Sequence, residues 1–219
     1  MAVYLRPSFV PLHSSVDPAP AALYSYPDDE QEIPPVTILV IADDEDVART
    51  VPDCRCDVLI SCGDLYDQTI LTVAEKVGCS QILAVKGNHD AATPFDPRIT
   101  DLHLKTVEIA GVTFGGFGGS WRYKPKGPFL LQQDEVCTAL SGFPRVDVFV
   151  AHNSPRGIHD RNDGVHVGFV AFSTYIRDHQ PKLFLHGHQH RNQMSLSGGT
   201  RVIGVYGCQT LVLDEGGRL

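Results

Sequence analysis

The pattern of apolar and polar residues changes near residue 36, and from there it predicts alternating strands and helices. Short apolar segments rich in β-branched residues at Val36–Ile41, Asp57–Ser61 and Gln81–Val85 are typical of buried strands. Between the second and third of these, the apolar spacing of Gln68–Val77 predicts a helix that ends at Gly78. This alternation is typical of an α/β domain.

The second half of the chain continues the same alternation. Leu104–Ile109 and Val112–Phe114 predict a hairpin that turns at Ala110 and Gly111 and leads into a glycine-rich loop, Gly115–Gly119. The order of strands and helices indicates two halves that contribute sheets to one sandwich. The remaining expected elements are a helix at Gln132–Leu140, a strand at Val146–Val150, a helix at Val167–Asp178, a strand at Lys182–Leu185 and antiparallel strands over Gln193–Leu213.

The first 35 residues have a different composition, rich in proline, serine and alanine, with an acidic segment at 28–30. We interpret residues 1–35 as a proline-rich tail or docking arm and residues 36–219 as one folded domain. The start of the chain lacks a basic region followed by an apolar segment, and no stretch is long enough to span a bilayer. We therefore expect a cytoplasmic protein with no membrane contact.

The charge balance is acidic, with 18 Lys plus Arg against 26 Asp plus Glu and a formal net charge of -8. Such a chain repels nucleic acid, and no basic groove is evident, so a nuclease is disfavoured. Any phosphate that it binds needs local positive charge, which a metal pair could supply. The sequence does not indicate an oligomeric state.

Six cysteines are scattered along the chain without a CxxC pair. Several lie in segments that are expected to be buried strands, so we predict reduced, packed thiols. A zinc site at Cys54 and Cys56 is disfavoured because the other cysteines are too far away in the sequence. The cysteines are Cys54, Cys56, Cys62, Cys79, Cys137 and Cys208.

Polar residues follow five of the predicted strands. Asp43 follows the first strand, Asp64 the second, Asn88 the third, His152 the fourth and His188 the fifth. One polar residue after a strand commonly forms a turn or caps a helix. Because open α/β sheets bind ligands beyond the carboxyl ends of their strands, the combination predicts a functional site there.

In order along the chain, these positions belong to Asp43-Asp44-Glu45, Gly63-Asp64, Gly87-Asn88-His89-Asp90, a lone His152 and Gly187-His188-Gln189-His190. This series resembles the signature of the calcineurin-like metallophosphoesterases, over Ile38 to about Gly207. The resemblance implies a fold of the α/β (α+β) class: a four-layer α-β-β-α sandwich of two mixed β-sheets flanked by helices.

The resemblance also implies two divalent metal ions, with Asp64 giving one oxygen to each. Ligands of this mixed oxygen and nitrogen type suit manganese, which we expect, with iron and zinc as alternatives. Glu45 departs from the pattern because the family usually has a histidine there. The implied ligands are Asp43, Glu45 and His190 for the first metal, and Asn88, His152 and His188 for the second.

The implied activity is hydrolysis of a small phosphate ester by a hydroxide that bridges the metals. His89 would be the general acid that protonates the leaving group, with Asp90 orienting its ring. We favour a phosphodiesterase over a phosphatase because this acid is present. The alternative is a catalytically weakened scaffold that binds other proteins, for which the loss of histidine at Glu45 would be a first step.

Two further features could contact the substrate, and another histidine has a structural interpretation. His166, expected at a helix N-terminus, could bind an anion, although a surface histidine is an equally good interpretation. Trp121, Arg122 and Tyr123 could form a rim that stacks a nucleobase or an aryl leaving group, or a surface loop packed by the tryptophan. His186 is interpreted as a packed residue at a strand end.

Overall fold

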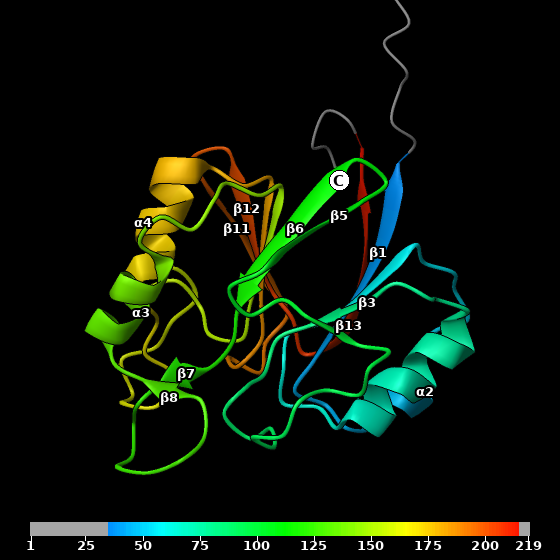
Figure 1. Cartoon of the computed structure of the whole chain (residues 1–219), viewed down its shortest axis with the longest axis horizontal. Coiled ribbons are helices and arrows are strands. Elements are labelled where there is room, and N and C mark those ends of the chain that lie inside the picture. The colour runs from blue at the N-terminus through cyan, green and yellow to red at the C-terminus, as the bar shows by residue number, and fades with distance from the viewer. Residues whose placement is uncertain (1–34, 215–219) are drawn as a thin grey trace, which may run out of the picture. The chain divides into compact units, whose positions relative to one another are not determined.

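Two β-sheets pack face to face in the computed structural model, which describes residues 35–214 (Figure 1). These residues belong to one unit of the chain, Glu32–Leu219. Apart from its last residue, the predicted tail or docking arm, residues 1–35, lies outside the described part. The first strand begins at Val36, where the apolar pattern begins in the sequence.

The first sheet has five strands in the order β13-β1-β2-β3-β4. Strands β1 to β4 are parallel, and β13 pairs with β1 in the antiparallel direction. The central strands are continuous apolar segments because both faces of this sheet are covered. The strands are β1 (Val36–Ala42), β2 (Val58–Ser61), β3 (Ile82–Ala84), β4 (Thr100–Asp101) and β13 (Gly207–Leu213).

The second sheet has six strands in the order β11-β12-β10-β9-β6-β5. Its four inner strands are parallel, and its two edge strands are antiparallel to their neighbours. The strands are β5 (Thr106–Ile109), β6 (Val112–Phe117), β9 (Val148–Ala151), β10 (Leu183–His186), β11 (Gln193–Ser197) and β12 (Thr200–Gly204); β7 (Ser120–Trp121) and β8 (Leu130–Leu131) form a separate pair.

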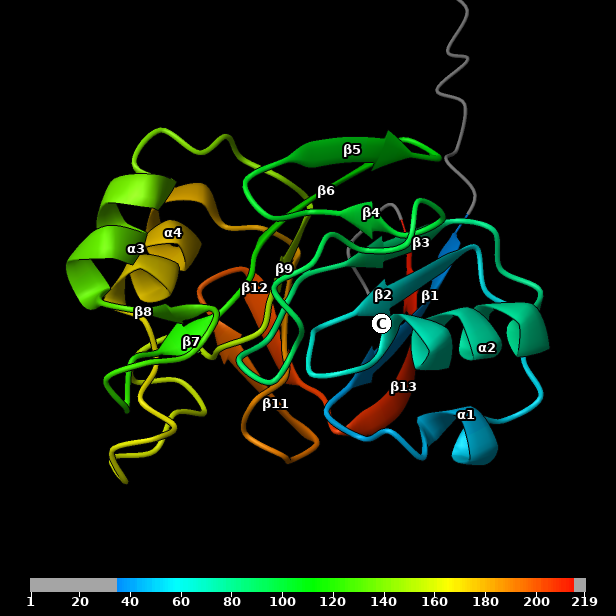
Figure 2. The ribbon, with the colours of Figure 1, turned by 60° about the horizontal axis from the view of Figure 1, so that its bottom comes forward.

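Three hydrophobic clusters hold four layers together. Figure 2 shows these layers from a second direction. Val40 and Val150 belong to the cluster between the two sheets, whereas Leu39 packs with Ile70 on the outer side of the first sheet. Phe149 packs under the helices of the second sheet. Successive strand residues thus face opposite clusters, as the pleat requires. The predicted four-layer α-β-β-α sandwich is confirmed.

Two helices cover each outer face of the sandwich (Figure 2). Helix α2 packs its apolar face on the first sheet and ends at Gly78, whose φ of +66° suits a residue without a side chain. Helix α3 begins with a capping box between Gln132 and Glu135. The helices are α1 (Val47–Thr50), α2 (Asp67–Val77), α3 (Gln133–Leu140) and α4 (Val170–His179).

Helix α4 begins at Val170, three residues later than the predicted start at Val167. The side chain of Gln133 on α3 explains the difference. Its Oε1 accepts a hydrogen bond from the Val170 N–H at 2.9 Å, and its Nε2 donates to the Gly168 carbonyl at 3.0 Å. The helix start is therefore fixed by a neighbouring helix, which local sequence could not indicate.

Strands β5 and β6 form the predicted hairpin. Ala110 and Gly111 have φ angles of +50° and +76°, as a two-residue hairpin turn requires. The predicted glycine loop is wrong in its first part, because Gly115 and Gly116 continue β6. A side-chain carbon at Gly116 would collide with the Val150 carbonyl on β9, so this glycine permits close strand packing.

The predicted antiparallel strands over Gln193–Leu213 are only partly confirmed. Strands β11 and β12 are antiparallel, but β12 is parallel to β10. Strand β13 crosses to the first sheet and pairs with β1. An apolar pattern gives the positions of strands and not their partners, so the sequence could not distinguish these arrangements.

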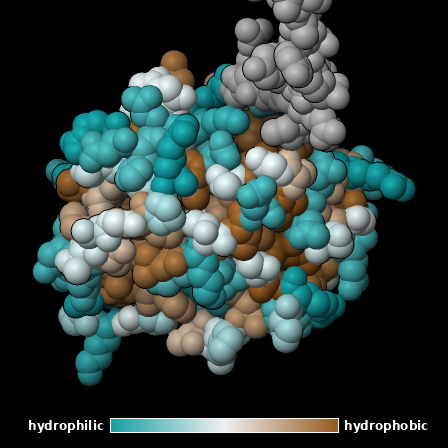
Figure 3. All heavy atoms as spheres, turned by 45° about the horizontal axis from the view of Figure 1, so that its top comes forward, coloured by the Kyte–Doolittle hydropathy of each residue, from teal (hydrophilic) through white to brown (hydrophobic). Residues whose placement is uncertain are grey.

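The surface mixes polar and apolar residues. Figure 3 shows one face, on which hydrophobic residues lie in separate areas among hydrophilic ones. Among large apolar side chains, Leu196 is 73% exposed, Tyr66 72% and Met194 66%. Within residues 35–214, no helix has the length and apolar character that crossing a membrane requires.

Candidate metal centre

The predicted ligands from both sheets meet at the carboxyl ends of the strands. Asp43 follows β1 directly, and the backbone N–H of His188, beyond β10, donates to Asp43 Oδ2 at 2.8 Å. His152 follows β9, and its Nδ1 lies 2.8 Å from the carbonyl oxygen of Cys62, which follows β2. These two hydrogen bonds join the two sheets at the site.

Four of the predicted ligands form the first group of donor atoms. Asp64, His152 and His188 each offer one atom, and these atoms lie within 4.8 Å of one another. His152 Nε2 is 3.4 Å from Asp64 Oδ2 and 3.1 Å from Asn88 Oδ1. The Asn88 amide donates from Nδ2 to the Tyr123 hydroxyl at 3.4 Å, which turns Oδ1 toward the histidine.

This first group fits a cation. When His152 donates from Nδ1 to the Cys62 carbonyl, its Nε2 lone pair faces the oxygens of Asp64 and Asn88. Three acceptor atoms then face one another in a buried place, which is unfavourable without positive charge between them. In histidines that bind metals, the ring nitrogen away from the metal commonly donates to a carbonyl, as Nδ1 of His152 does here.

The pKa values of His152 and Asp64 also indicate that the first group needs a positive charge. Burial disfavours a charged His152 ring, but the charge and hydrogen bond of Asp64 outweigh burial and raise the pKa of His152 to about 9. Burial also opposes ionisation of Asp64, yet His152 holds the pKa of this carboxyl well below its usual range. In the protein without metal, a proton on His152 therefore supplies the positive charge.

Asp43 and His190 form the second group. The Asp43 side chain is fully buried, its Oδ1 has no hydrogen-bond partner, and that oxygen lies 3.6 Å from His190 Nε2. Burial raises the pKa of Asp43 to about 7 and lowers the pKa of His190. A buried unpartnered carboxylate oxygen facing a neutral imidazole suits a divalent ion, since both atoms can be ligands.

Glu45 lines the same cavity as Asp43 and His190, but its carboxylate contacts the start of helix α2. Oε1 accepts a hydrogen bond from the Tyr66 N–H at 2.7 Å, and Oε2 accepts one from the Thr69 hydroxyl at 2.5 Å. Ligation by Glu45 remains a prediction.

The backbone under the ligands is conformationally unusual. Four predicted ligands have left-handed φ angles, which side-chain-bearing residues adopt only when the surroundings enforce them. A side-chain carbon at Gly87 would collide with the Asp64 carboxylate and the His152 ring. The backbone that carries the ligands is therefore strained, and there is no room for a side chain at position 87. The four residues are Asp43 (+62°), Asp64 (+56°), His188 (+64°) and His190 (+51°).

His89 and Asp90 differ in their surroundings. His89 is exposed, and its backbone N–H donates to Asp64 Oδ1 at 2.7 Å. We expected Asp90 to orient the His89 ring. Instead, both of its oxygens accept backbone hydrogen bonds, from Gly87 at 2.6 Å, Asp64 at 3.0 Å and Leu65 at 3.2 Å. Asp90 thus joins the two ligand-bearing loops, which the residue pattern alone could not show.

A cavity of about 200 Å³ opens over the second group and extends to His89. It is small enough to suit a phosphoryl group and open enough for the rest of a substrate to lie outside. Its lining residues are Asp43, Glu45, Asp64, Leu65, Tyr66, His89, Asp90 and His190.

His166 lies beside the predicted ligands, though not at a helix N-terminus as expected. Its ring centroid is 5.1 Å from that of His188 and 6.4 Å from that of His190. Asp163 Oδ2 is 2.7 Å from His166 Nδ1, so the aspartate fixes the ring orientation. The structure therefore places His166 beside two of the predicted ligands.

The predicted aromatic rim is only partly present at the site. Trp121 packs against the cluster under α3 and α4, and Arg122 donates to the Leu130 carbonyl and to Glu135. Only Tyr123 of the three reaches a predicted ligand, through Asn88.

Two other tyrosines lie at the site and were not predicted. Tyr66 lines the cavity, and the ring of Tyr206 stacks on His190 with centroids 5.4 Å apart. Tyr206 follows β12 just as the ligands follow their strands, so its position after a strand was the available signal.

His186 is fully buried at the end of β10, as predicted for a packed histidine. Its Nδ1 faces the Gly187 carbonyl at 2.9 Å, and its Nε2 faces His159 Nδ1 at 2.9 Å. Burial lowers the pKa of His186 to about 3. The ring is neutral and belongs to the support of the loop that carries His188.

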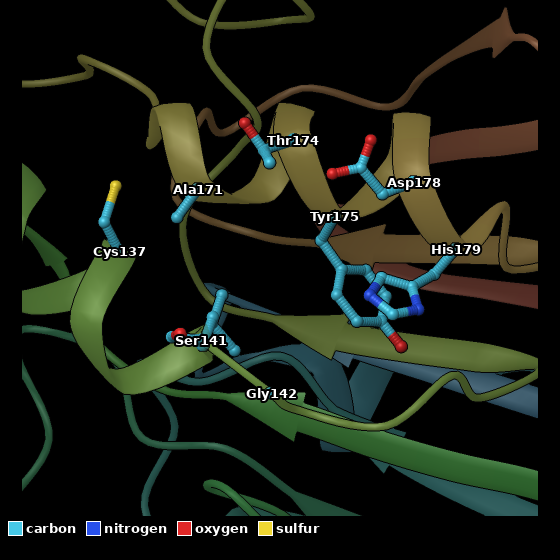
Figure 4. Close-up of a pocket in the computed structure, with 9 residues that line it drawn as sticks. Cys137, Ser141, Gly142, Ala171, Thr174, Tyr175, Asp178 and His179 are labelled. Carbon is cyan, nitrogen blue, oxygen red and sulfur yellow. The ribbon is translucent and has the colours of Figure 1, made fainter.

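A second cavity, of about 300 Å³, lies between α3 and α4 (Figure 4). Tyr175 and His179 stack at one end of it, with ring centroids 4.5 Å apart. The Tyr175 hydroxyl donates to the Pro144 carbonyl, and Asp178 pairs with Arg177. These polar groups already have partners within the chain, so this cavity is a weaker candidate than the carboxyl-end site.

The fold and the site define a two-sheet α/β domain with a metal centre candidate at the carboxyl ends of its strands. The sequence pattern of the calcineurin-like phosphoesterase superfamily domain matches residues 40–209. The chain therefore belongs to the calcineurin-like phosphoesterase superfamily. None of the curated proteins compared with this chain matches it.

Solved structures with a similar fold come from several bacteria. Phosphopantetheinyl hydrolase of Mycobacterium tuberculosis has a TM-score of 0.54 and 15% identity, covering 78% of this chain and 89% of its own. A putative 5'-nucleotidase of Staphylococcus aureus has a TM-score of 0.54 and 14% identity, and the match covers 82% of this chain and 51% of the nucleotidase chain. The protein TT1561 of Thermus thermophilus has a TM-score of 0.50 and 13% identity, and the match covers 77% of this chain and 88% of TT1561. At these identities, the likeness supports the fold.

Proposed function

We propose that this protein is a dinuclear metal-dependent phosphodiesterase that hydrolyses a small phosphate ester. The observation that carries the proposal is the convergence of three potential ligand atoms, because His152 Nε2 lies 3.4 Å from Asp64 Oδ2 and 3.1 Å from Asn88 Oδ1. The unpartnered Asp43 oxygen beside His190 supports a second ion. Manganese is the ion that we propose, because the donors mix carboxylates, an amide and imidazoles.

The proposed ligand groups are those that the geometry brings together. When bound, two divalent ions would activate a water molecule and neutralise charge on the phosphoryl oxygens. Asp64 would face both ions, since His152 lies on one side of it and the cavity with Asp43 on the other. The proposed sets are Asn88, His152 and His188 for one ion, and Asp43, His190 and Glu45 for the other.

His89 is the proposed general acid. It lines the cavity, is exposed to solvent, and is held through its backbone by the Asp64 carboxylate. A protonated ring at this position can give its proton to the leaving alkoxide of an ester. Asp90 positions the loop beneath it through the backbone of Gly87 and Asp64. His166, oriented by Asp163, is the proposed contact to a phosphoryl oxygen.

The proposal is tested by hydrolysis of two phosphodiesters that differ in the pKa of the leaving alcohol. Protein stripped of metal is assayed with manganese, zinc, iron or magnesium added back, alongside His89→Ala. We expect metal-dependent turnover, and a larger loss in His89→Ala for the ester with the more basic leaving group, because that alcohol depends more on proton transfer. The expected loss is about 10²- to 10⁴-fold.

His179→Ala is the matched control, since this histidine lies against Tyr175, away from the site, and should leave turnover unchanged. An absence of turnover with every metal and both esters would contradict the proposal that this protein is a phosphodiesterase. It would favour the alternative of a scaffold that binds other proteins.

A further inference from the structure

Four of the six cysteines lie on the outer side of the first sheet. Cys54, Cys56 and Cys208 are partly buried and pack against the cluster that contains Cys79. Within this group, Cys56 precedes β2 and Cys79 precedes β3. Both therefore lie at the amino ends of the strands, whereas the ligands lie at the carboxyl ends.

The strand register brings together the segments that precede β2 and β3, which carry Cys56 and Cys79. Strands β2 and β3 are parallel, with Leu59 opposite Ile82. Cys56 is three residues before Leu59, and Cys79 is three residues before Ile82. The Leu59 N–H also donates to the Gln81 carbonyl at 2.9 Å, so the segments that carry the two cysteines converge at the amino ends of these strands.

The two thiols are also electrostatically linked. Interaction with the Cys56 side chain lowers the pKa of the Cys79 thiol. Cys79 lines an open cavity of about 370 Å³ beside α2, and Cys56 is partly exposed, so a small reagent can reach the pair. Cys79 Sγ lies 3.4 Å from the Gln81 carbonyl oxygen, which fixes its side chain.

We propose that Cys56 and Cys79 form an oxidisable dithiol, a modification site that reacts with peroxides and closes to an intramolecular disulfide. Hydrogen peroxide transfers one oxygen to the Cys79 sulfur, giving a sulfenic acid and water. The Cys56 sulfur then attacks the Cys79 sulfur, so that the S–S bond forms, the S–O bond breaks and a second water leaves with the thiol proton. The two thiols lose two electrons, and these reduce the peroxide.

The experiment uses the full chain, reduced and then treated with hydrogen peroxide. After free thiols are alkylated, the protein is digested without reductant and analysed by mass spectrometry. We expect peptides joined through Cys56 and Cys79, with two fewer alkylated thiols per chain. Cys56→Ser should lack this link, whereas Cys137→Ser, which removes a thiol on α3, should keep it.

A thermal measurement gives a second readout. The disulfide closes residues 56–79 into a loop, so the oxidised protein should melt on the order of 5–10 °C higher than the reduced protein. The same rise is expected in Cys137→Ser and none in Cys56→Ser. Recovery of both cysteines in alkylated form after peroxide treatment, or a link that joins Cys54 to Cys208 instead, would overturn the proposal.

Discussion

The ionisation of two buried residues links metal binding to pH. The pKa of His152 is raised to about 9 because the charge of Asp64 outweighs burial, and burial raises the pKa of Asp43 to about 7. Near neutral pH, His152 therefore holds a proton and Asp43 holds one part of the time. A metal ion needs both groups without their protons.

Binding of manganese should therefore release protons. At pH 7 we expect more than one proton per chain when both sites fill, and weaker apparent affinity as the pH falls below about 7, where Asp43 is protonated. Calorimetric titrations in buffers with different ionisation enthalpies measure the number directly. Binding without proton release would contradict the ligand roles of both residues.

The space around Gly87 makes a second prediction at the residue scale. Gly87→Ala places a carbon against the Asp64 carboxylate and the His152 ring, so Asp64 must move. We expect manganese affinity to fall at least about 10-fold, as for other losses of support around a metal ligand.

Gly199→Ala is the matched control, because the nearest atom to the added carbon is Gln180 Oε1 at 3.7 Å. Both affinities are measured by titration with manganese. Equal affinity in the two variants would show that Asp64 is not held as tightly as the structure indicates.

At the scale of elements, Glu45 has two competing roles. Its carboxylate accepts hydrogen bonds from Tyr66 and Thr69 at the first turn of α2, where an acidic side chain stabilises the helix. The sequence pattern places the same residue among the ligands. The position of a residue in a motif indicates its neighbourhood, but only the three-dimensional contacts show which nearby donors use its oxygens.

Glu45→Ala separates these roles. Loss of the helix contacts should lower Tm by about 2–4 °C. If Glu45 also binds the metal, manganese affinity should fall, whereas a helix contact alone leaves it nearly unchanged. Glu108→Ala, an exposed glutamate on β5, controls for loss of charge. An unchanged Tm would contradict the helix role.

Elements could be predicted where the apolar pattern alone determines them. The parallel strands β1, β2, β9 and β10 follow from continuous apolar segments, and the Asp43 and His152 positions follow from the ends of β1 and β9. The late start of α4 depends on Gln133 of another helix, and the crossing of β13 depends on a partner strand. The contacts of Asp90 likewise depend on distant backbone groups, which no local pattern contains.

Across the whole molecule, a buried neutral histidine makes stability depend on pH. Burial lowers the pKa of His186 from 6.5 to about 3 in the folded protein. Between these pH values the unfolded chain binds a proton that the folded protein does not, so stability is full above about pH 6.5 and falls as the pH decreases.

We expect His186 to lower the free energy of unfolding by about 1.4 kcal/mol for each pH unit of decrease between pH 6.5 and about 3. Urea unfolding at pH 7, 6 and 5, in the presence of a chelator, gives the free energy of unfolding of the wild type and of His186→Gln. The slope of this free energy against pH is then compared between the two proteins. His179→Gln, which changes a partly exposed histidine on α4, should keep the wild-type slope. Parallel pH dependence in the wild type and His186→Gln would contradict a neutral buried ring.

The most direct test of the whole account is the dependence of phosphodiester hydrolysis on bound manganese. Metal-stripped wild type and Asp64→Asn are titrated with manganese while turnover and bound metal are measured in the same samples. The account predicts no turnover without metal, activity that rises until about two ions are bound per chain, and neither full binding nor activity in Asp64→Asn. Turnover that is independent of bound manganese, or full activity in Asp64→Asn, would contradict it.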